Sequence, residues 1–264
     1  MLSVTSVQLN EWLVAFLWPL ARILALIGAA PVLGDSSLPV RVKVGLGVLI
    51  AIVVAPGIGP LPKVDPGSLS GLLILAQQIV IGSAMGLAMR VIFAAVEAAG
   101  EIAGLQMGLG FATLIVPESD GSTLVIGQFL GLLAALMFLS IDGHLMMINT
   151  LNESFAAFPV SAQPFSVGGL ALLADWGGKI FAAGVWLSLP LIGVLLITNL
   201  ALGILTRASP QLNLLSVGFP ITLTVGMAAL LLSLPHFVPS LLQLVSEGMK
   251  VMLDVARGLH VPNH

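Results

Sequence analysis

Arg22 is the most conspicuous side chain in this sequence that could do chemistry, because it is a lone cation inside an apolar run. The letters WLVAFLWPLA precede it and ILALIGAAPVL follow it. A charged side chain at membrane depth is costly, so we expect this intramembrane charge to face the interior of a helix bundle or a partner. A structural ion pair is favoured over a role in transport, and both interpretations stay open at this point.

Residues arranged for catalysis are hard to find elsewhere in the chain. Asp142 and His144 are two apart, which turns them about 200° from each other on a helix, so they form no joint site unless the helix breaks at Gly143. The chain has no HExxH, no GxSxG and no phosphate-binding loop, and it contains no cysteine. We therefore predict a protein that is not an enzyme, with no catalytic residue, no cofactor and no metal site.

The composition of the chain indicates which kind of structural element would position such residues. Nine Lys and Arg and twelve Asp and Glu are spread over 264 residues, and the mean hydropathy is +1.12. Ordinary soluble domains are about one quarter charged, so this pattern predicts a polytopic membrane protein that contacts lipid. No basic run of the kind that follows nucleic-acid phosphates is present, which argues against nucleic-acid binding.

Helical segments account for nearly all of the chain, and the fold class is all-α. A weaker, interrupted stretch lies at 90–121, and Pro220, Pro235 and Pro239 predict breaks in the last segment. The apolar segments that we expect are 12–33, 44–62, 67–89, 122–147, 180–206 and 212–246.

Glycines recur at a spacing of four in Gly100, Gly104 and Gly108. This spacing places small residues on one helix face, where backbones can approach closely. They are predicted to form a packing face within the chain or toward partner subunits, although glycine is also simply common in membrane helices. Arg90, Glu97 and Glu101 follow a related stripe, which predicts either a polar seam toward a pore or another subunit, or a solvated helix at the membrane surface.

The passage GLQMGLGFATLIVPESDGS, residues 104–122, is the most unusual in the chain. It begins as a glycine-spaced helix and continues as an apolar run that ends in an acidic turn. Hydrophobic constrictions can gate a wide pore by excluding water, and a re-entrant packing loop is the alternative. The apolar side chains that would form the seal are Met107, Phe111, Leu114 and Ile115.

A turn is predicted after the fifth segment, in Arg207–Asn213. Pro210 cannot continue a regular hydrogen-bond ladder, so the turn exposes Gln211 and Asn213 as donors and acceptors. We expect these two residues to contact a neighbouring subunit, with helix capping as the alternative.

Four passages together resemble the FliR family, the flagellar export-gate proteins of type III secretion. They are ARILALIGAAPVLGDSSLPVRVKVGL, EIAGLQMGLGFATLIVPESDGS, IDGHLMMI and RASPQLNLLSVGFP, and they occur in this order over almost the whole length. The resemblance implies a single FliR-type domain over 1–264, built of kinked helical hairpins. It also implies a loop that plugs a central pore, and 106–122 matches that loop.

The resemblance also implies a place in a larger machine. A FliR-type chain would complete a helical hetero-oligomer with FliP-like and FliQ-like subunits in the bacterial inner membrane, at the flagellar basal body. FlhB-like and FlhA-like export proteins and exported unfolded flagellar proteins would be its other partners, with Gln211 and Asn213 facing the FlhB-like protein. The expected function is a non-enzymatic structural and gating subunit of a protein-export channel. A small-solute secondary transporter is the alternative, because broken helices and a buried Arg22 would suit it too.

Overall fold

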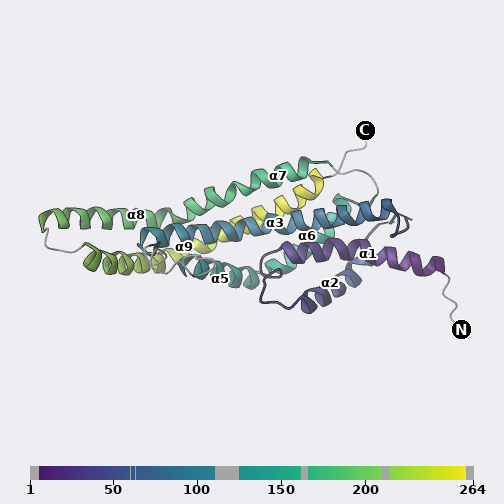
Figure 1. The fold of residues 1–264 in the computed structure, drawn as a ribbon, viewed down its shortest axis with the longest axis horizontal. Coiled ribbons are helices and arrows are strands. Elements are labelled where there is room, and N and C mark those ends of the chain that lie inside the picture. The colour runs from purple at the N-terminus through teal and green to yellow at the C-terminus, as the bar shows by residue number, and fades with distance from the viewer. Residues whose placement is uncertain are drawn as a thin grey trace. The chain divides into compact units, whose positions relative to one another are not determined.

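Every element of the computed structural model is a helix within the residues it describes, which confirms the all-α prediction. These residues are 6–59, 61–62, 64–110, 125–161, 166–209 and 214–259, and the side chains of 6–15 and 214–216 are not among those described. In chain order (Figure 1) the elements are α1 (Ser6–Ala29), α2 (Val40–Val54), the short 3₁₀ turn η1 (Ala55–Gly57), α3 (Leu69–Gln106), α5 (Val125–Ser140), α6 (Gly143–Ala157), α7 (Gly168–Gly177), α8 (Lys179–Ala208) and α9 (Leu214–Gly258).

Four helical stretches in the described part of the chain are long and apolar enough to cross a membrane. They are Val40–Gly57, Leu69–Gln106, Gly168–Ala208 and Val217–Gly258. A fifth is obtained if α5 and α6, which meet at a bend of 68°, count as one broken span. Among the residues of the first predicted segment whose side chains are described, Phe16–Ala29 forms a shorter apolar helix. The described helices therefore have the length and composition to cross a membrane, as the sequence predicts.

Two predicted interruptions are wrong. Helix α9 continues through Pro220, Pro235 and Pro239, because each proline removes only one hydrogen bond from a helix of 45 residues. Helix α3 continues past residue 90 as far as Gln106, through a stretch rich in alanine, the residue with the highest helix propensity. The interruption begins only after Gln106.

The bend between α5 and α6 lies where the sequence has Ile141 and Asp142. Asp142 has a φ of 56°, in the left-handed region that aspartate tolerates better than most residues, and it precedes the first turn of α6. Asp142 is exposed and His144 is half-buried. The helix therefore breaks just before Gly143.

The connection between α1 and α2 is unusually tight. The Leu33 amide donates to Pro31 O at 2.7 Å across Val32, whose φ of 63° is rare for a β-branched residue. The Lys43 ammonium of α2 donates to Gly34 O at 2.9 Å. Asp35 accepts from the Ser37 hydroxyl and amide, which holds the pKa of its carboxyl below the usual value. This turn fixes α2 beside α1.

The chain divides into two compact units, each made of stretches that are distant in sequence. The first contains 1–91, 141–177 and 245–264, and the second contains 92–140 and 178–244. Helices α3 and α9 each run from one unit into the other. The assignment of 1–264 as one FliR-type domain stays a prediction.

Glycines bring helices into backbone contact in both units. In the first unit, a side chain at Gly82 would collide with the carbonyl oxygen of Arg22, and one at Gly86 would lie 2.8 Å from Leu26 O. In the second unit, a Cβ at Gly100 would lie 2.6 Å from the Gly127 Cα and 2.7 Å from Ile126 O. The predicted glycine face thus includes a close crossing of α3 and α5 at Gly100.

Gly100→Ala should destabilise the protein, because the added methyl group meets main-chain atoms that cannot move aside. We expect a loss of about 1–3 kcal/mol in the free energy of unfolding of the purified chain. Gly193→Ala in α8 is the matched control, since a Cβ there meets nothing within 4 Å. It should leave stability unchanged or raise it slightly through helix propensity. Equal stability of the two variants would contradict the close crossing.

Candidate functional site

The predicted gate begins where α3 ends. A glycine cap terminates this helix. The amide of Leu109 donates to Gly104 O and the amide of Gly108 donates to Leu105 O, each at 3.0 Å. Gly108 has a φ of 88°. These two bonds with a left-handed glycine form a Schellman motif, which satisfies the carbonyls of the last turn and stops the helix. Gly108 therefore fixes the point at which the chain leaves α3.

Met107 lies just before this cap and is anchored on α9. Its side chain is fully buried, and the Thr222 hydroxyl donates to its carbonyl oxygen at 3.1 Å. A Cβ at Gly226 would lie 2.6 Å from the Met107 Cγ, so the thioether fills the space that this glycine leaves free. Methionine suits such a position because it is unbranched and adapts to irregular gaps. The first residue of the proposed seal is thus packed inside the second unit.

The start of α5 is held against α3. A Cβ at Gly127 would lie 3.0 Å from Glu97 O, and one at Gly131 would lie 3.0 Å from the Glu97 side chain. Glu101 lies against Gly127 through its Cγ. The acidic stripe of α3 therefore runs along the glycines of α5, while Arg90 is exposed in the other unit.

The structure describes only some of the other residues that are predicted for packing, the gate and the partner contact. Gly104 is buried, and its role in packing against partner subunits stays a prediction. Phe111, Leu114 and Ile115 lie outside the described residues, and so do Gln211 and Asn213. Helix α8 ends at Ala208, and the predicted turn at Pro210 lies outside the described residues.

Arg22 occupies a buried polar cluster in the first unit. Its Nε donates to Gln78 Oε1 of α3 at 2.8 Å. One terminal nitrogen donates to Ser154 O at 3.0 Å and to Ser154 Oγ at 3.1 Å, and the other donates to Phe158 O at 2.9 Å. One side chain thereby joins α1, α3 and the end of α6.

Within the described residues, the four hydrogen bonds of Arg22 all end on neutral oxygens and no carboxylate pairs with its charge. Ser154 O and Phe158 O lie at the carboxyl end of α6, where the aligned peptide dipoles leave partial negative charge. The Arg22 Cζ also lies 4.2 Å from the centre of the Phe155 ring, within cation–π range. The helix end and the ring replace the carboxylate that the sequence led us to expect.

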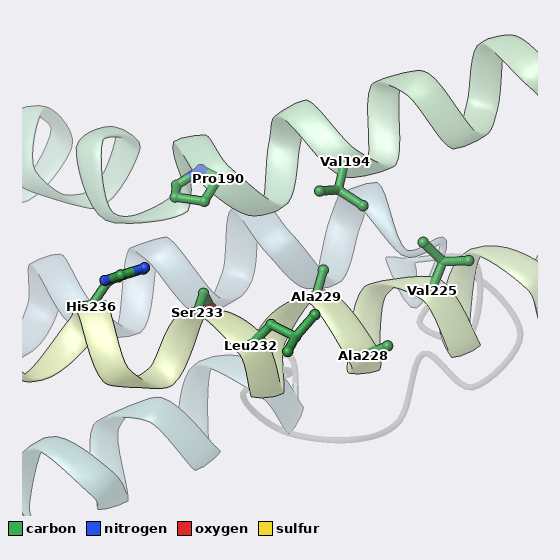
Figure 2. A pocket seen from close by; sticks show the side chains of 8 residues that line it. All are labelled: Pro190, Val194, Val225, Ala228, Ala229, Leu232, Ser233 and His236. Carbon is green, nitrogen blue, oxygen red and sulfur yellow. The ribbon is translucent and has the colours of Figure 1, made fainter.

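A groove between α8 and α9 is a feature that the sequence did not reveal. Pro190 and Val194 of α8 face Val225, Ala228, Ala229, Leu232, Ser233 and His236 of α9 (Figure 2), around a volume of about 370 Å³. His236 is the one imidazole in the lining, and the Ser233 hydroxyl donates a hydrogen bond to Leu230 O. Within the described residues, no group of three or more His, Cys, Asp or Glu side chains could hold a metal ion.

Known proteins resemble this chain over nearly its full length. Residues 13–248 match the family described as bacterial export proteins, family 1. The flagellar biosynthetic protein FliR of Pectobacterium carotovorum subsp. carotovorum is 47% identical over 97% of both chains, and that of Escherichia coli K12 is 43% identical over 97% of both. The FliR of Aquifex aeolicus is 31% identical, over 87% of this chain and 89% of its own.

Arg22→Leu should destabilise the protein by about 2–4 kcal/mol, because the buried oxygens at the end of α6 lose hydrogen bonds to a charged donor. Arg22→Lys should recover only part of this loss, since one ammonium cannot reach Gln78, Ser154 and Phe158 together. Ser154→Ala, which removes one acceptor, should cost about 1 kcal/mol. Unfolding of the purified variants in denaturant measures these differences, and a Lys variant as stable as the parent would contradict the bridging role.

Gly108→Ala should weaken the end of α3 by about 1–2 kcal/mol, because an L side chain is strained at a φ of 88°. Gly108→Asn should cost less, since asparagine visits the left-handed region more readily. Hydrogen exchange of the Gly108 and Leu109 amides reports on this cap directly. Slow exchange in both variants would mean that the glycine is not needed to end the helix.

Proposed function

The chain belongs to the bacterial export proteins, family 1, and within them to the flagellar FliR proteins, and we propose that it is a structural and gating subunit of the flagellar type III protein-export channel. In this proposal it performs no catalysis, and other parts of the apparatus supply the energy. It completes a core complex with FliP-like and FliQ-like subunits in the bacterial inner membrane, at the flagellar basal body. Its passage 106–122 contributes a plug to the pore.

The observation that carries the gating proposal is the anchored pair of helix ends around that passage. Helix α3 stops at the Gly108 cap with Met107 fixed under α9, and α5 resumes at Val125 beside α3. The passage between them contains the apolar residues Phe111, Leu114 and Ile115 and then the acidic residue Glu118. A pore wide enough for an unfolded polypeptide must hold back ions at rest, and apolar side chains do this by excluding water.

The surface of the chain supports an assembly embedded in a membrane. Only 33% of the apolar window in Gly168–Ala208 and 22% of that in Val217–Gly258 is buried within the chain. Lipid or neighbouring apolar helices must cover the rest, because large exposed apolar surfaces mark interaction sites. We assign part of this surface to the FliP-like and FliQ-like subunits, and the turn with Gln211 and Asn213 to an FlhB-like protein. FlhA-like proteins and exported unfolded flagellar proteins complete the proposed partners.

The secondary-transporter alternative loses its main support in the cluster around Arg22. A transported anion needs a cation with free hydrogen-bond donors in a cavity. Arg22 already donates four hydrogen bonds to its own chain, and its terminal nitrogens hold the end of α6. Its role is thus to support the fold.

Deleting about residues 110–118, or replacing Phe111 with Ala, should make the resting membrane permeable to small ions while export is partly retained. The reason is that the apolar seal is lost, while the helices that line the path remain. Ser119→Ala is a matched control in the same passage and should leave the closed state tight. Conductance of export-gate complexes in planar bilayers, measured beside export in motile cells, tests this. A deletion variant as tight as the parent would place the seal in another subunit.

A further inference from the structure

Asn199 stands apart from the hydroxyl-bearing side chains of α8. It is exposed, and its amide makes no hydrogen bond within the described part of the chain. The described hydroxyl groups of α8 each donate a hydrogen bond to a backbone carbonyl of their own helix. These bonds are Ser188 to Val185 O, Thr198 to Val194 O and Thr206 to Gly203 O. Among the hydroxyl and amide side chains that the structure describes on this helix, the Asn199 amide is therefore the one without a hydrogen-bond partner.

The position of Asn199 along α8 strengthens its need for a hydrogen-bond partner. Residues 180–206 contain no charged side chain, and Asn199 is the only amide side chain among them. Arg207 follows eight residues later, so it lies about 12 Å further along the helix axis. If Arg207 reaches the membrane surface, Asn199 lies well inside a hydrocarbon layer of about 30 Å. An amide at that depth requires a hydrogen-bonding neighbour.

Asn199 belongs to a continuous stripe on α8. Ile192, Leu196, Asn199, Gly203 and Thr206 alternate at spacings of four and three, which places them on one face of the helix. We call this set the Asn199 stripe. Leu196 is 56% exposed, and a Cβ at Gly203 would meet nothing within 4 Å. The stripe thus has an apolar ridge, one amide and an open small residue where another backbone could approach closely.

The contacts within the second unit leave the middle of this stripe free, because Leu196, Asn199 and Gly203 are exposed while Ile192 and Thr206 are half-buried. The core-facing side chains of α8 include Ser188, Leu191 and Leu195, which are buried. Pro190 and Val194, which face α9 across the groove in Figure 2, lie on the flank of α8 opposite the Asn199 stripe. The core and α9 therefore use two sides of α8, and the stripe is on a third.

We propose that the Asn199 stripe is the docking surface for an apolar membrane helix of a different, neighbouring subunit, which presents a hydrogen-bonding group opposite Asn199. Lipid tails do not suit this surface, because they offer the amide no partner. A heptad seam with one asparagine is a known means of fixing the register between helices at some cost in stability. The asparagine would thus set the position of the neighbour along α8. This inference rests on the proposed function, because it requires a hetero-oligomeric assembly.

The first test measures recovery of the hetero-oligomer when the chain is co-expressed with its FliP-like and FliQ-like partners and purified in mild detergent. Asn199→Leu should lower recovery about 3- to 10-fold, because the group opposite Asn199 loses its hydrogen bond. Asn199→Gln should lose less, since it keeps an amide. Thr198→Val is the matched control and should assemble normally, because the Thr198 hydroxyl is satisfied by Val194 O in its own helix.

The second test identifies the neighbour directly. A photo-reactive side chain at Leu196 should crosslink to a different subunit of the assembled complex. A second copy of this chain as the product would overturn the proposal, and so would crosslinking only to lipid. The same probe at Ile197, which is 72% exposed on another face, controls for contacts made by α8 in general.

The outcomes separate this inference from the function on which it rests. Recovery of Asn199→Leu equal to or above that of the parent would overturn the docking surface alone, as would unchanged assembly with altered conductance, which would place Asn199 in the pore. Failure of the parent chain to form any complex with the FliP-like and FliQ-like subunits would contradict the proposed function as well.

Discussion

The hydrogen bonds of Arg22 hold the first unit together. A guanidinium buried without a carboxylate is stable only where other dipoles supply the missing negative charge. The last carbonyls of α6 do so here, with the Gln78 side chain and the Phe155 ring completing the surroundings. The planar fork of arginine can reach three separate groups at once, which lysine cannot. The positions of α1, α3 and α6 are thereby tied to one side chain.

The close approach of the helix backbones allows Arg22 to make these contacts. Gly82 of α3 packs directly against the carbonyl of Arg22, so the two helix axes lie near enough for Arg22 to meet Gln78 one turn away. In the second unit, Gly100 and Gly127 bring α3 and α5 together in the same manner, and Gly184 packs against Ala95 and Ala98. Membrane helices gain little from apolar burial against one another, so small residues and hydrogen bonds provide most of the specificity.

The two units share α3, and this helix connects the parts of the molecule that bear on function. Its first half carries Gln78 and Gly82 in the Arg22 cluster, and its second half carries Gly100 and ends at Gly108. The passage proposed as the plug therefore begins at the end of a helix, from a point held by Met107 and Thr222. A gate that is to move between defined states benefits from such fixed ends, because only the residues between them need to change conformation.

The membrane character, the helical fold class, the family and the burial of Arg22 could all be predicted from the amino-acid sequence. These properties depend on composition, local periodicity and ordered motifs, which can be read along the chain. The continuity of α9 through three prolines, the partners of Arg22 and the unpaired state of Asn199 could not be predicted in this way. Arg22 meets Gln78, Ser154 and Phe158, which are 56, 132 and 136 residues away in the chain. Such pairings emerge only when the helices pack, because the neighbour of a side chain depends on how closely two helices approach, and residues distant in sequence set that distance.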